Sequence, residues 1–518
     1  MFTVEIFDGL EIVYVRATAG DLLLDIIRKS GKPILAPCGG KGSCQKCRVE
    51  VDGGGAVLAC KFIIEKSLKV TLPVAANMQI LERNYLAQKI SDNNSGIDIL
   101  INKQRTVAYQ GREIFSDDGN SIQKYGLAID VGTTTVAIYL EDLDNGQLVD
   151  SGSIINPQSA YGADVISRVS FCIEKESGVA ELQRALIDAM NGVISSLCQV
   201  NNITPGDIYK SSFVGNTVML HILCGVSPAT IAFAPYTPIF TEGKQLRGAD
   251  LNLMMHKAGV INILPSIAGY VGADIVAGVA ATDMLTRSSY SLYIDIGTNG
   301  EMVLGNREKL NCCATAAGPA FEGANISCGV GGVNGAISEY TADEYAVIGG
   351  GPPIGICGSA LIDVTAFLLD QGRIDASGYM ESDFVLASAH ESATGAPIFL
   401  TPNDVREVQL AKAAIFAGIQ TLLKHANISF DDIDRLYLAG GFGNYIRKDS
   451  AIRIGLLPLE LAEKIIPIGN SAGAGARYAL KSQNFSNQID AVLERAEYIE
   501  LSMKMDFNEA YVAAMGFV

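Results

Sequence analysis

A sequence motif that occurs twice limits the folds open to this chain more than any other feature. The stretch GLAIDVGTTTVAIYL begins at residue 126, and LYIDIGTNGEMVL begins at residue 292. In both, an apolar run ends in Asp, and Gly-Thr precedes a second apolar run, so that the shared core is L-x-I-D-[VI]-G-T-[TN]. Each copy is typical of two strands joined by a short turn. A repeat at this distance predicts a duplicated α/β domain.

The repeated turn has the chemistry of a phosphate site. A strand that ends in Asp and continues into Gly-Thr places a carboxylate beside backbone N–H groups and hydroxyls. Two such hairpins facing each other can bind a triphosphate, with the two Asp side chains holding Mg²⁺, largely through water. A third apolar run, RLYLAGGFGNYI from residue 435, ends in glycines that permit close approach to adenine and ribose. Two copies followed by Gly-Gly-x-Gly favour a nucleotide site over three unrelated hairpins.

This order of motifs resembles the superfamily of actin, sugar kinases and heat-shock chaperones over residues 126 to 480. The resemblance implies a duplicated RNase H-like α/β fold that binds ATP and Mg²⁺, with Asp130 and Asp295 as catalytic residues. The stretch ATAAGPAFEGANI resembles the one that follows the second motif in the chaperones, which implies that Glu322 lies near the nucleotide. The implied cofactor-binding residues of the two phosphate motifs and the adenosine motif are Gly132, Thr133 and Thr134, then Gly297, Thr298, Asn299, Gly300 and Glu301, then Gly440, Gly441 and Gly443.

Length, charge and apolar patterning argue against several other classes of protein. At 518 residues the chain predicts several domains. Its net charge of −17 argues against a protein that binds nucleic acid by neutralising phosphates. The start MFTVEIFDGLEIVYV lacks the pattern of a signal peptide, and no apolar run reaches the ~18 residues of a membrane span. We therefore expect a cytoplasmic protein, with neither nucleic acid nor membrane as a partner, and reduced cysteines.

Four of the eleven cysteines lie close together near the N-terminus, at Cys38, Cys44, Cys47 and Cys60. Their spacing, C-x5-C-x2-C-x12-C, is close to that of plant-type [2Fe–2S] ferredoxins. Glycines at 39, 40 and 42 would let backbone N–H groups turn toward the sulfides without strain. A structural zinc site is the alternative, but zinc sites usually contain two C-x2-C pairs and this stretch has one.

The residues around these cysteines predict a small α+β domain. FTVEIF and EIVYVRA flank Asp8-Gly9 and predict a hairpin. The stretch TAGDLLLDIIRKSG predicts a helix with Thr18 as N-cap, Asp21 three residues on and Gly31 at its end. CRVEV, AVLAC and SLKVTLP add strands, which gives a β-grasp plan. The apolar helix face is expected at Leu22, Leu23, Ile26 and Ile27. The module resembles ferredoxin, although its last cysteine gap is shorter than in plant ferredoxins.

The two modules together resemble the reductive activators of corrinoid proteins. The stretches CGGKGSCQKCRV, NPQSAYGADVISR, VGNTVMLH, IAGYVGAD and AAGPAFEG carry the resemblance along nearly the whole chain. It implies an ATP-dependent reductase that passes an electron from a [2Fe–2S] cluster to a Co(II) corrinoid protein and returns it to Co(I). It also implies an unidentified low-potential electron donor as a partner and a homodimer in solution.

We expect four units along the chain. They are a [2Fe–2S] ferredoxin-like domain at 1–78, a linker at 79–125, and two ATPase halves at 126–285 and 286–518. Within the linker, ANMQILERNYLAQKI predicts a helix and IDILIN a strand.

Three alternatives remain open at this stage. One is another ATP-driven activator, such as those of 2-hydroxyacyl-CoA dehydratases, which lack a separate ferredoxin domain. The second is a small-molecule kinase with a ferredoxin-like regulatory module. The third is a non-enzymatic iron–sulfur sensor whose actin-like core only binds nucleotide.

Several other residues have a structural and a functional interpretation. His221 is a candidate cobalt ligand, but a histidine on a helix face is more often structural. Cys312 and Cys313 would point to opposite faces of a strand, which favours burial of at least one. Asp164 and Asp274 stand at predicted helix starts, where capping is the ordinary role, and Asp274 is also a candidate for orienting a hydrolytic water.

Overall fold

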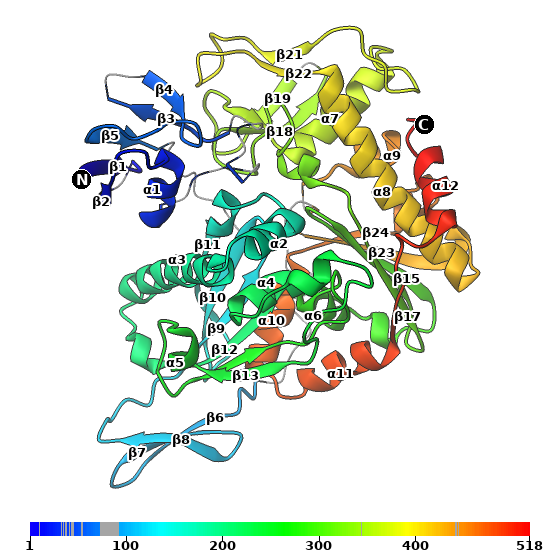
Figure 1. Ribbon diagram of the computed structural model, residues 1–518. Helices are drawn as coiled ribbons and strands as arrows, with labels where there is room; N and C mark the ends of the chain where they lie inside the picture. The colour runs from blue at the N-terminus through cyan, green and yellow to red at the C-terminus, as the bar shows by residue number, and fades with distance from the viewer. Residues whose placement is uncertain are drawn as a thin grey trace.

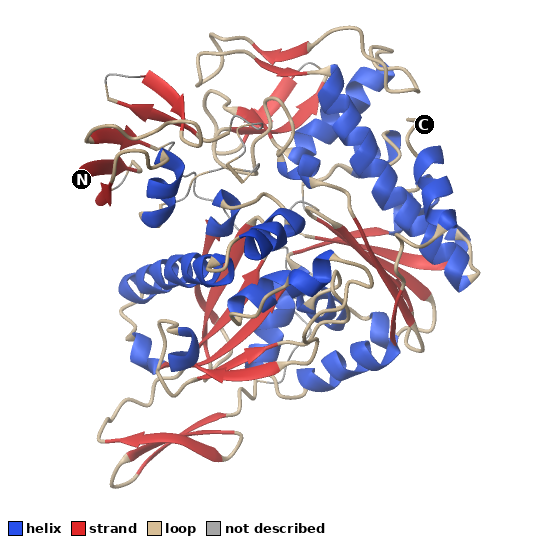
Figure 2. Cartoon of the chain, viewed as in Figure 1, coloured by secondary structure: helices blue, strands red, loops and turns tan. Residues whose placement is uncertain are grey.

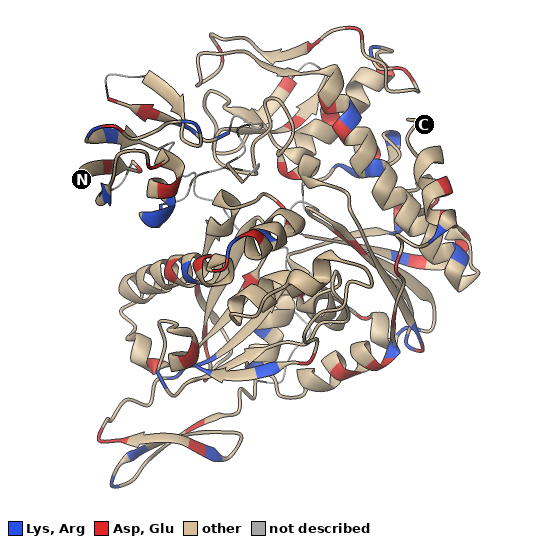
Figure 3. Cartoon of the chain, in the orientation of Figure 1, with Lys and Arg blue, Asp and Glu red and all other residues tan. Residues whose placement is uncertain are grey.

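Two large mixed sheets covered by helices form the body of the molecule, with smaller sheets attached to it (Figures 1 and 2). The structure is a computed structural model. It describes the chain except residues 10, 33, 35, 37, 38, 41, 43–45, 53, 54, 73–92, 343, 441, 442, 444 and 518. The α/β class expected for the body is confirmed. Lys and Arg are interspersed with Asp and Glu along the chain (Figure 3).

The N-terminal unit is a five-stranded sheet with one helix. β1 (Phe2–Phe7) pairs antiparallel with β2 (Ile12–Ala17) across the expected turn, and parallel with β5 (Leu68–Thr71). β3 (Arg48–Val51) and β4 (Gly55–Leu58) complete the sheet in the order β2-β1-β5-β3-β4. The helix α1 (Leu23–Lys29) buries Leu23, Leu24, Ile26 and Ile27. This is the arrangement of the predicted β-grasp unit.

The start of α1 differs from the predicted cap. Leu22, not Thr18, is the N-cap residue, and it makes no side-chain cap. The Thr18 N–H instead donates to Asp21 Oδ2 at 2.8 Å, and Leu22 pairs with Ile63 as an isolated bridge. Pairing with this neighbouring segment keeps Leu22 extended, so it is 37% exposed and Leu24 takes its place in the apolar face. Gly31, with φ +73°, ends the helix as expected.

Part of the segment expected to be a linker is a folded antiparallel sheet. Its strands are β6 (Ile97–Ile101), which is the predicted strand, β7 (Arg105–Tyr109) and β8 (Arg112–Asp117). The sheet packs on the first lobe defined below, since the ring of Phe115 stacks on His256 with centroids 3.8 Å apart. The helix predicted for residues 76–90 lies outside the described residues.

The first lobe is a six-stranded sheet in the order β11-β10-β9-β12-β14-β13, with five helices. The strands are β9 (Tyr125–Val131), β10 (Thr135–Asp142), β11 (Leu148–Ile155), β12 (Ile208–Gly215), β13 (Lys244–Arg247) and β14 (Val260–Ile263). The helices are α2 (Val165–Glu174), α3 (Gly178–Val200), α4 (Thr217–Leu223), α5 (Gly248–Leu251) and α6 (Ala273–Ala280). All eight residues of β12 are buried, as expected of a parallel strand covered on both faces.

The second lobe is a six-stranded sheet in the order β24-β23-β15-β16-β17-β25. Its strands are β15 (Tyr290–Ile296), β16 (Gly300–Gly305), β17 (Leu310–Thr315), β23 (Ile433–Ala439), β24 (Ile465–Gly469) and β25 (Ala496–Tyr498). Its helices are α7 (Gly358–Asp370), α8 (Pro402–Ala426), α9 (Lys448–Arg453) and α12 (Met505–Ala513). Small additional sheets are formed by β18 (Ala336–Thr341), β19 (Glu344–Val347) and β20 (Gly355–Ile356), and by β21 (Phe384–Ala387) and β22 (Ile398–Leu400).

The two lobes share one topology. In each, the motif strand pairs antiparallel with the next strand on one side and parallel with a later strand on the other. The corresponding series are β11-β10-β9-β12-β14 and β17-β16-β15-β23-β24. The duplication predicted from the repeated motif is therefore confirmed at the level of strand order.

The helix α10 (Ser471–Lys481) joins the lobes. It follows β24 of the second sheet but packs on β9, β12 and α6 of the first, and α11 (Phe485–Arg495) follows it. The helices α10 and α6 approach closely, because a Cβ on Gly475 would lie 2.4 Å from the carbonyl oxygen of Ala277. The motif strands of both lobes thus end near this shared helix.

Candidate nucleotide cleft

The first predicted phosphate hairpin is the turn between β9 and β10. Gly132 is needed there, since a Cβ on it would lie 2.6 Å from the Thr135 carbonyl oxygen. The Asp130 carboxylate ends β9 and accepts a hydrogen bond from Asn470 Nδ2 at 2.9 Å. Burial raises the pKa of Asp130 to about 6, an effect that this hydrogen bond opposes. Asn470 in turn caps α10, because its side chain accepts from the Gly473 N–H.

The second predicted hairpin joins β15 to β16. Burial raises the pKa of Asp295 to about 7, and the charges of Asp130 and Glu322 add to the shift. Burial also raises the pKa of Glu301 well above its ordinary value, although Asn299 Nδ2 donates to its carboxylate at 3.2 Å. Gly300 fits a tight place, because a Cβ on it would lie 2.8 Å from Thr315 Oγ1.

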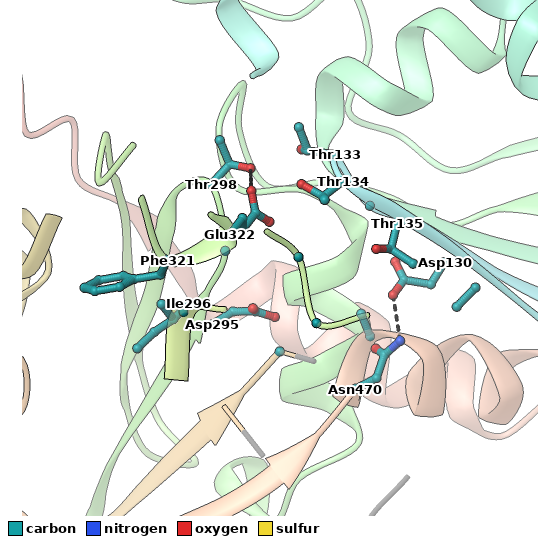
Figure 4. Close-up of a pocket in the computed structure, with 18 of the residues that line it drawn as sticks. Asp130, Thr133, Thr134, Thr135, Asp295, Ile296, Thr298, Phe321, Glu322 and Asn470 are labelled. Carbon is teal, nitrogen blue, oxygen red and sulfur yellow. Dashed lines mark hydrogen bonds between the residues drawn. The ribbon is translucent and has the colours of Figure 1, made fainter. Parts of the chain in front are cut away.

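Glu322 connects the two hairpins. It ends the short helix η5 (Pro319–Glu322), and its Oε2 accepts a hydrogen bond from Thr298 Oγ1 at 2.6 Å. Burial raises the pKa of Glu322, and the Thr298 hydrogen bond and the nearby Thr134 hydroxyl partly offset this shift. Figure 4 shows Glu322 between Thr298 on one side and Thr134 on the other. One threonine from each phosphate hairpin therefore lies beside the same carboxylate.

The predicted adenosine loop follows β23, beside the second hairpin. Because β23 pairs parallel with β15, Ala439 lies opposite Asp295. A Cβ on Gly440 would lie 2.7 Å from Asp295 Oδ1, and its φ of +91° also requires glycine. Gly443 is close-packed as well, with a Cβ position 2.6 Å from the Ala439 carbonyl oxygen. Gly441 lies outside the described residues.

These elements enclose a cavity of about 290 Å³ between the two lobes. This volume is at the lower end of the range of ~300–1,000 Å³ usual for small-molecule sites. Of the predicted residues, its lining includes Asp130, Gly132, Thr133, Thr134, Asp295, Gly297, Thr298, Asn299, Glu301, Glu322 and Gly440. The structure therefore brings both hairpins and the start of the glycine loop around one space.

The lining also contains polar residues that the sequence analysis gave no nucleotide role, or only an alternative one, and Asp274, Asn216 and Asn470 are among them. Asp274 stands in the first turn of α6, and burial, followed by the charge of Asp130, raises its pKa to about 8. Asn216 and Asn470 each cap a helix that follows a strand. The sequence contains a helix-start signal for both asparagines, since Gly-Asn-Thr and Gly-Asn-Ser follow apolar runs at residues 215 and 469.

Five carboxylates thus face one cleft, and several raise one another's pKa. Such a set is suited to a hard cation, because hard cations prefer carboxylate oxygens as ligands. Within the part of the chain that the structure describes, no three Asp, Glu, His or Cys side chains are close enough to hold a metal ion directly. The carboxylates therefore fit a cation that keeps part of its water shell.

The cysteine loop can be described in part. Cys47 is 1% exposed and Cys60 6% exposed, while Cys38 and Cys44 lie outside the described residues. The three glycines of the loop have φ values of +66°, +98° and +79°, at positions 39, 40 and 42. These left-handed conformations agree with the predicted need for glycine around an iron–sulfur cluster.

The other candidate residues have structural roles. His221 is buried, and both of its ring nitrogens are engaged, by the Thr217 carbonyl at 2.8 Å and by the Ile239 N–H at 3.1 Å. Asp164 caps α2 by accepting from the Ser167 N–H. Cys312 and Cys313 are both buried, on opposite faces of β17. No helix among the described residues is long and apolar enough to cross a membrane.

Comparison with known proteins covers the whole chain. Residues 125–287 match a family model described as the RACo middle region, and residues 289–518 match one described as the C-terminal domain of RACo, the ASKHA domain. The corrinoid activation enzyme RamQ of Eubacterium limosum is 31% identical over 95% of both chains. A solved structure of a reductive activator for corrinoid, iron-sulfur protein is 30% identical and covers 100% of this chain and 98% of its own, with a TM-score of 0.77.

Two further relatives match smaller parts. The [Co(II) methylated amine-specific corrinoid protein] reductase of Methanosarcina barkeri is 24% identical over 76% of this chain and 77% of its own. One component of the Na(+)-translocating NADH-quinone reductase of Klebsiella pneumoniae is 33% identical over 11% of this chain and 19% of its own.

Proposed function

Since the chain belongs to the RACo family of reductive activators of corrinoid proteins, we propose that it returns a Co(II) corrinoid protein to Co(I) in an ATP-dependent reaction. One electron is added to the cobalt of the partner protein. The observation that carries the proposal is the union, in one chain, of a ferredoxin-like unit and a duplicated-lobe cleft lined by two phosphate-type hairpins.

We propose that the cleft binds ATP with Mg²⁺. The two turns offer backbone N–H groups and the hydroxyls of Thr133, Thr134 and Thr298 to phosphate oxygens. Asp130 and Asp295 would hold the ion through water, and its positive charge would offset the charge of Asp130 that raises the pKa of Asp295. Asp274 orients the attacking water, because its carboxylate lines the same space. Glycines 440, 441 and 443 receive the adenosine.

We propose that Cys38, Cys44, Cys47 and Cys60 hold one [2Fe–2S] cluster. When bound, such a cluster supplies one-electron transfer at low potential. The buried positions of Cys47 and Cys60, together with the left-handed glycines, support this ligand set. An external low-potential reductant supplies the electron. We further propose a homodimer and the division into units at 1–78, 79–125, 126–285 and 286–518.

The test is an anaerobic reduction assay with a Co(II) corrinoid protein and an artificial reductant strong enough to reduce the cluster. We expect the Co(I) absorbance band to appear with ATP and Mg²⁺ and to be absent or much slower without ATP. If Co(I) forms equally fast in both cases, the ATP-dependent function is wrong. If it never forms while the protein phosphorylates a small molecule, the kinase alternative takes its place.

A further inference from the structure

The N-terminal unit contacts both lobes, through one basic side chain for each. Arg28 of α1 donates from Nε to the Ala160 carbonyl at 3.0 Å, and its guanidinium lies 4.7 Å from the ring centre of Tyr161. Lys46, directly before Cys47, donates from Nζ to the carbonyls of Ile326 at 3.1 Å and Gly329 at 3.2 Å. Figure 1 shows the unit, in blue, beside elements of the two lobes. These two side chains attach the N-terminal unit to both lobes.

The contact on the first lobe is closely fitted. The Arg28 side chain is only 11% exposed, and its Nη2 also donates to the Gly39 carbonyl at 3.3 Å. A Cβ on Gly39 would lie 3.2 Å from the Tyr161 carbonyl oxygen, so Gly39 packs directly against the 160–161 turn. The contact is therefore part of the loop that carries the proposed cluster ligands.

A buried arginine connects this turn to the first phosphate hairpin. Arg168 has no exposed surface, and its Nη2 donates to the Thr133 carbonyl at 2.5 Å. Its Nε donates to the Gly162 carbonyl at 3.0 Å, two residues from the carbonyl that Arg28 holds. One planar guanidinium therefore holds the Thr133 turn and the docking turn at the same time.

The second docking point is connected to the second hairpin through Glu322. The residues that follow Glu322 form a compact turn, in which the Gly329 N–H donates to the Ile326 carbonyl at 3.0 Å. A Cβ on Gly323 would lie 2.4 Å from the Val330 carbonyl oxygen, so the two ends of the turn touch. Because the turn is closely packed, movement of Glu322 moves the carbonyls that Lys46 holds.

We propose that Arg28 and Lys46 are positioning residues that form a two-point clasp, and that nucleotide opens it. Phosphate oxygens compete for the Thr298 hydroxyl, which donates to Glu322 in this structure, and for the Thr134 hydroxyl, which lies beside Glu322. Loss of these contacts frees Glu322 and loosens the turn under Lys46, and the N-terminal unit is released to approach the partner. The proposal rests on nucleotide binding in the cleft, as proposed above.

The test measures the reactivity of the Lys46 amine in the full, cluster-loaded chain. The protein is treated briefly with an N-hydroxysuccinimide acetate reagent, with and without a non-hydrolysable ATP analogue and Mg²⁺, and modification is quantified by mass spectrometry. We expect Lys46 modification to rise several-fold with the analogue. Lys69 is the internal control, because it lies on the same unit with a side chain 63% exposed and should not respond.

Two variants of Arg28 test the clasp without changing the nucleotide cleft. Arg28→Ala should make Lys46 react fast even without nucleotide, while Arg28→Lys should restore protection in part. Arg16→Ala, at an exposed position on β2, is the matched control and should behave as the wild type. Iron content is measured for each, so that loss of the cluster is not mistaken for release.

The outcomes that would overturn the proposal are distinct from failure of the proposed function. If calorimetry shows nucleotide binding but Lys46 reactivity is unchanged, nucleotide does not open the clasp. If Arg28→Ala leaves Lys46 protected, the two contacts do not act together and the clasp is wrong. If no nucleotide binds at all, the proposed function and nucleotide-driven release both fail, and the Arg28→Ala arm still decides whether the clasp exists.

Discussion

At the scale of single residues, the cleft is distinguished by buried carboxylates whose pKa values are raised. Burial raises the pKa values of Asp130, Asp295 and Asp274 to about 6, 7 and 8, and neighbouring carboxylate charges add to the shifts of Asp295 and Asp274. Carboxylates placed this way cost stability unless a cation or proton is present. Their arrangement therefore suits a site that binds a cation.

Removing one of these carboxylates should abolish hydrolysis without affecting the N-terminal unit. Asp295→Ala and Asp130→Ala leave the charge of Mg²⁺ and the phosphates poorly matched, so we expect ATP hydrolysis to fall by at least ~10²-fold. The visible spectrum of the iron–sulfur cluster should be unchanged. Asp431→Ala, at an exposed position, is the control. Normal hydrolysis in both cleft variants would show that the site is assigned wrongly.

His221 should make stability depend on pH. Burial lowers the pKa of its imidazole from the ordinary 6.5, and the neutral ring accepts the Ile239 N–H at Nε2. Below pH 6.5 the unfolded chain binds a proton that the folded state resists, so the free energy of unfolding falls as pH falls. Urea unfolding at about pH 7 and about pH 5.5 measures this.

The same measurement on variants isolates the histidine. His221→Gln should lose part of the pH dependence, although it is less stable at neutral pH. His390→Gln, at an exposed position, should retain the dependence of the wild type. An equal dependence in all three proteins would contradict the assigned role.

At the scale of elements, one buried lysine joins three parts of the chain. Lys210 of β12 is 2% exposed, and its Nζ donates to the carbonyls of Ser95, Ala479 and Leu480 at 2.9, 3.2 and 2.8 Å. The last two belong to the C-terminal turn of α10, where carbonyls lack helical partners. The lysine therefore holds the segment before β6, the first sheet and the shared helix together.

Replacing this lysine by an apolar side chain of similar length should destabilise the first lobe. Lys210→Met leaves three carbonyls without their donor, which we expect to lower the free energy of unfolding by roughly 2–3 kcal/mol. Urea unfolding followed by circular dichroism measures the change. Lys257→Met, at an exposed position, is the control. If the stabilities of the two variants differ by no more than experimental error, Lys210 does not have this structural role.

At the scale of the whole molecule, the proposed function assigns electron transfer and nucleotide chemistry to separate units. Cys60 lies in the N-terminal unit, whereas the cleft lies between the lobes. We expect Cys60→Ser to damage the cluster and abolish Co(I) formation while the protein still binds nucleotide, since no cleft residue is altered. Cys198→Ser, at a buried position in α3 far along the chain, should retain both. Loss of nucleotide binding in Cys60→Ser would contradict separate units.

Local patterns in the sequence were enough for the repeated hairpins and the ferredoxin-like unit. An apolar run ending in Asp-x-Gly-Thr determines a strand and its turn within a few residues, and the duplicated topology of β9 and β15 follows from its recurrence. The Asn470 cap could also have been predicted, because Gly-Asn-Ser follows an apolar run. The cap at Thr18 could not, since the outcome depended on pairing between Leu22 and Ile63, which are distant in sequence.

By itself, the sequence determined the α/β class, the two phosphate hairpins and the chemistry of the candidate sites, because each depends on the order of neighbouring residues. Only the tertiary structure decided that Glu322 lies between Thr134 and Thr298, and that Arg28 and Lys46 fasten the N-terminal unit to both lobes. An arginine or lysine on a surface has the same local pattern whether it faces water or another unit. Its partner carbonyl lies 132 or 280 residues away in the sequence. The pairing depends on how the units pack, and this packing cannot be inferred from neighbouring residues in the sequence.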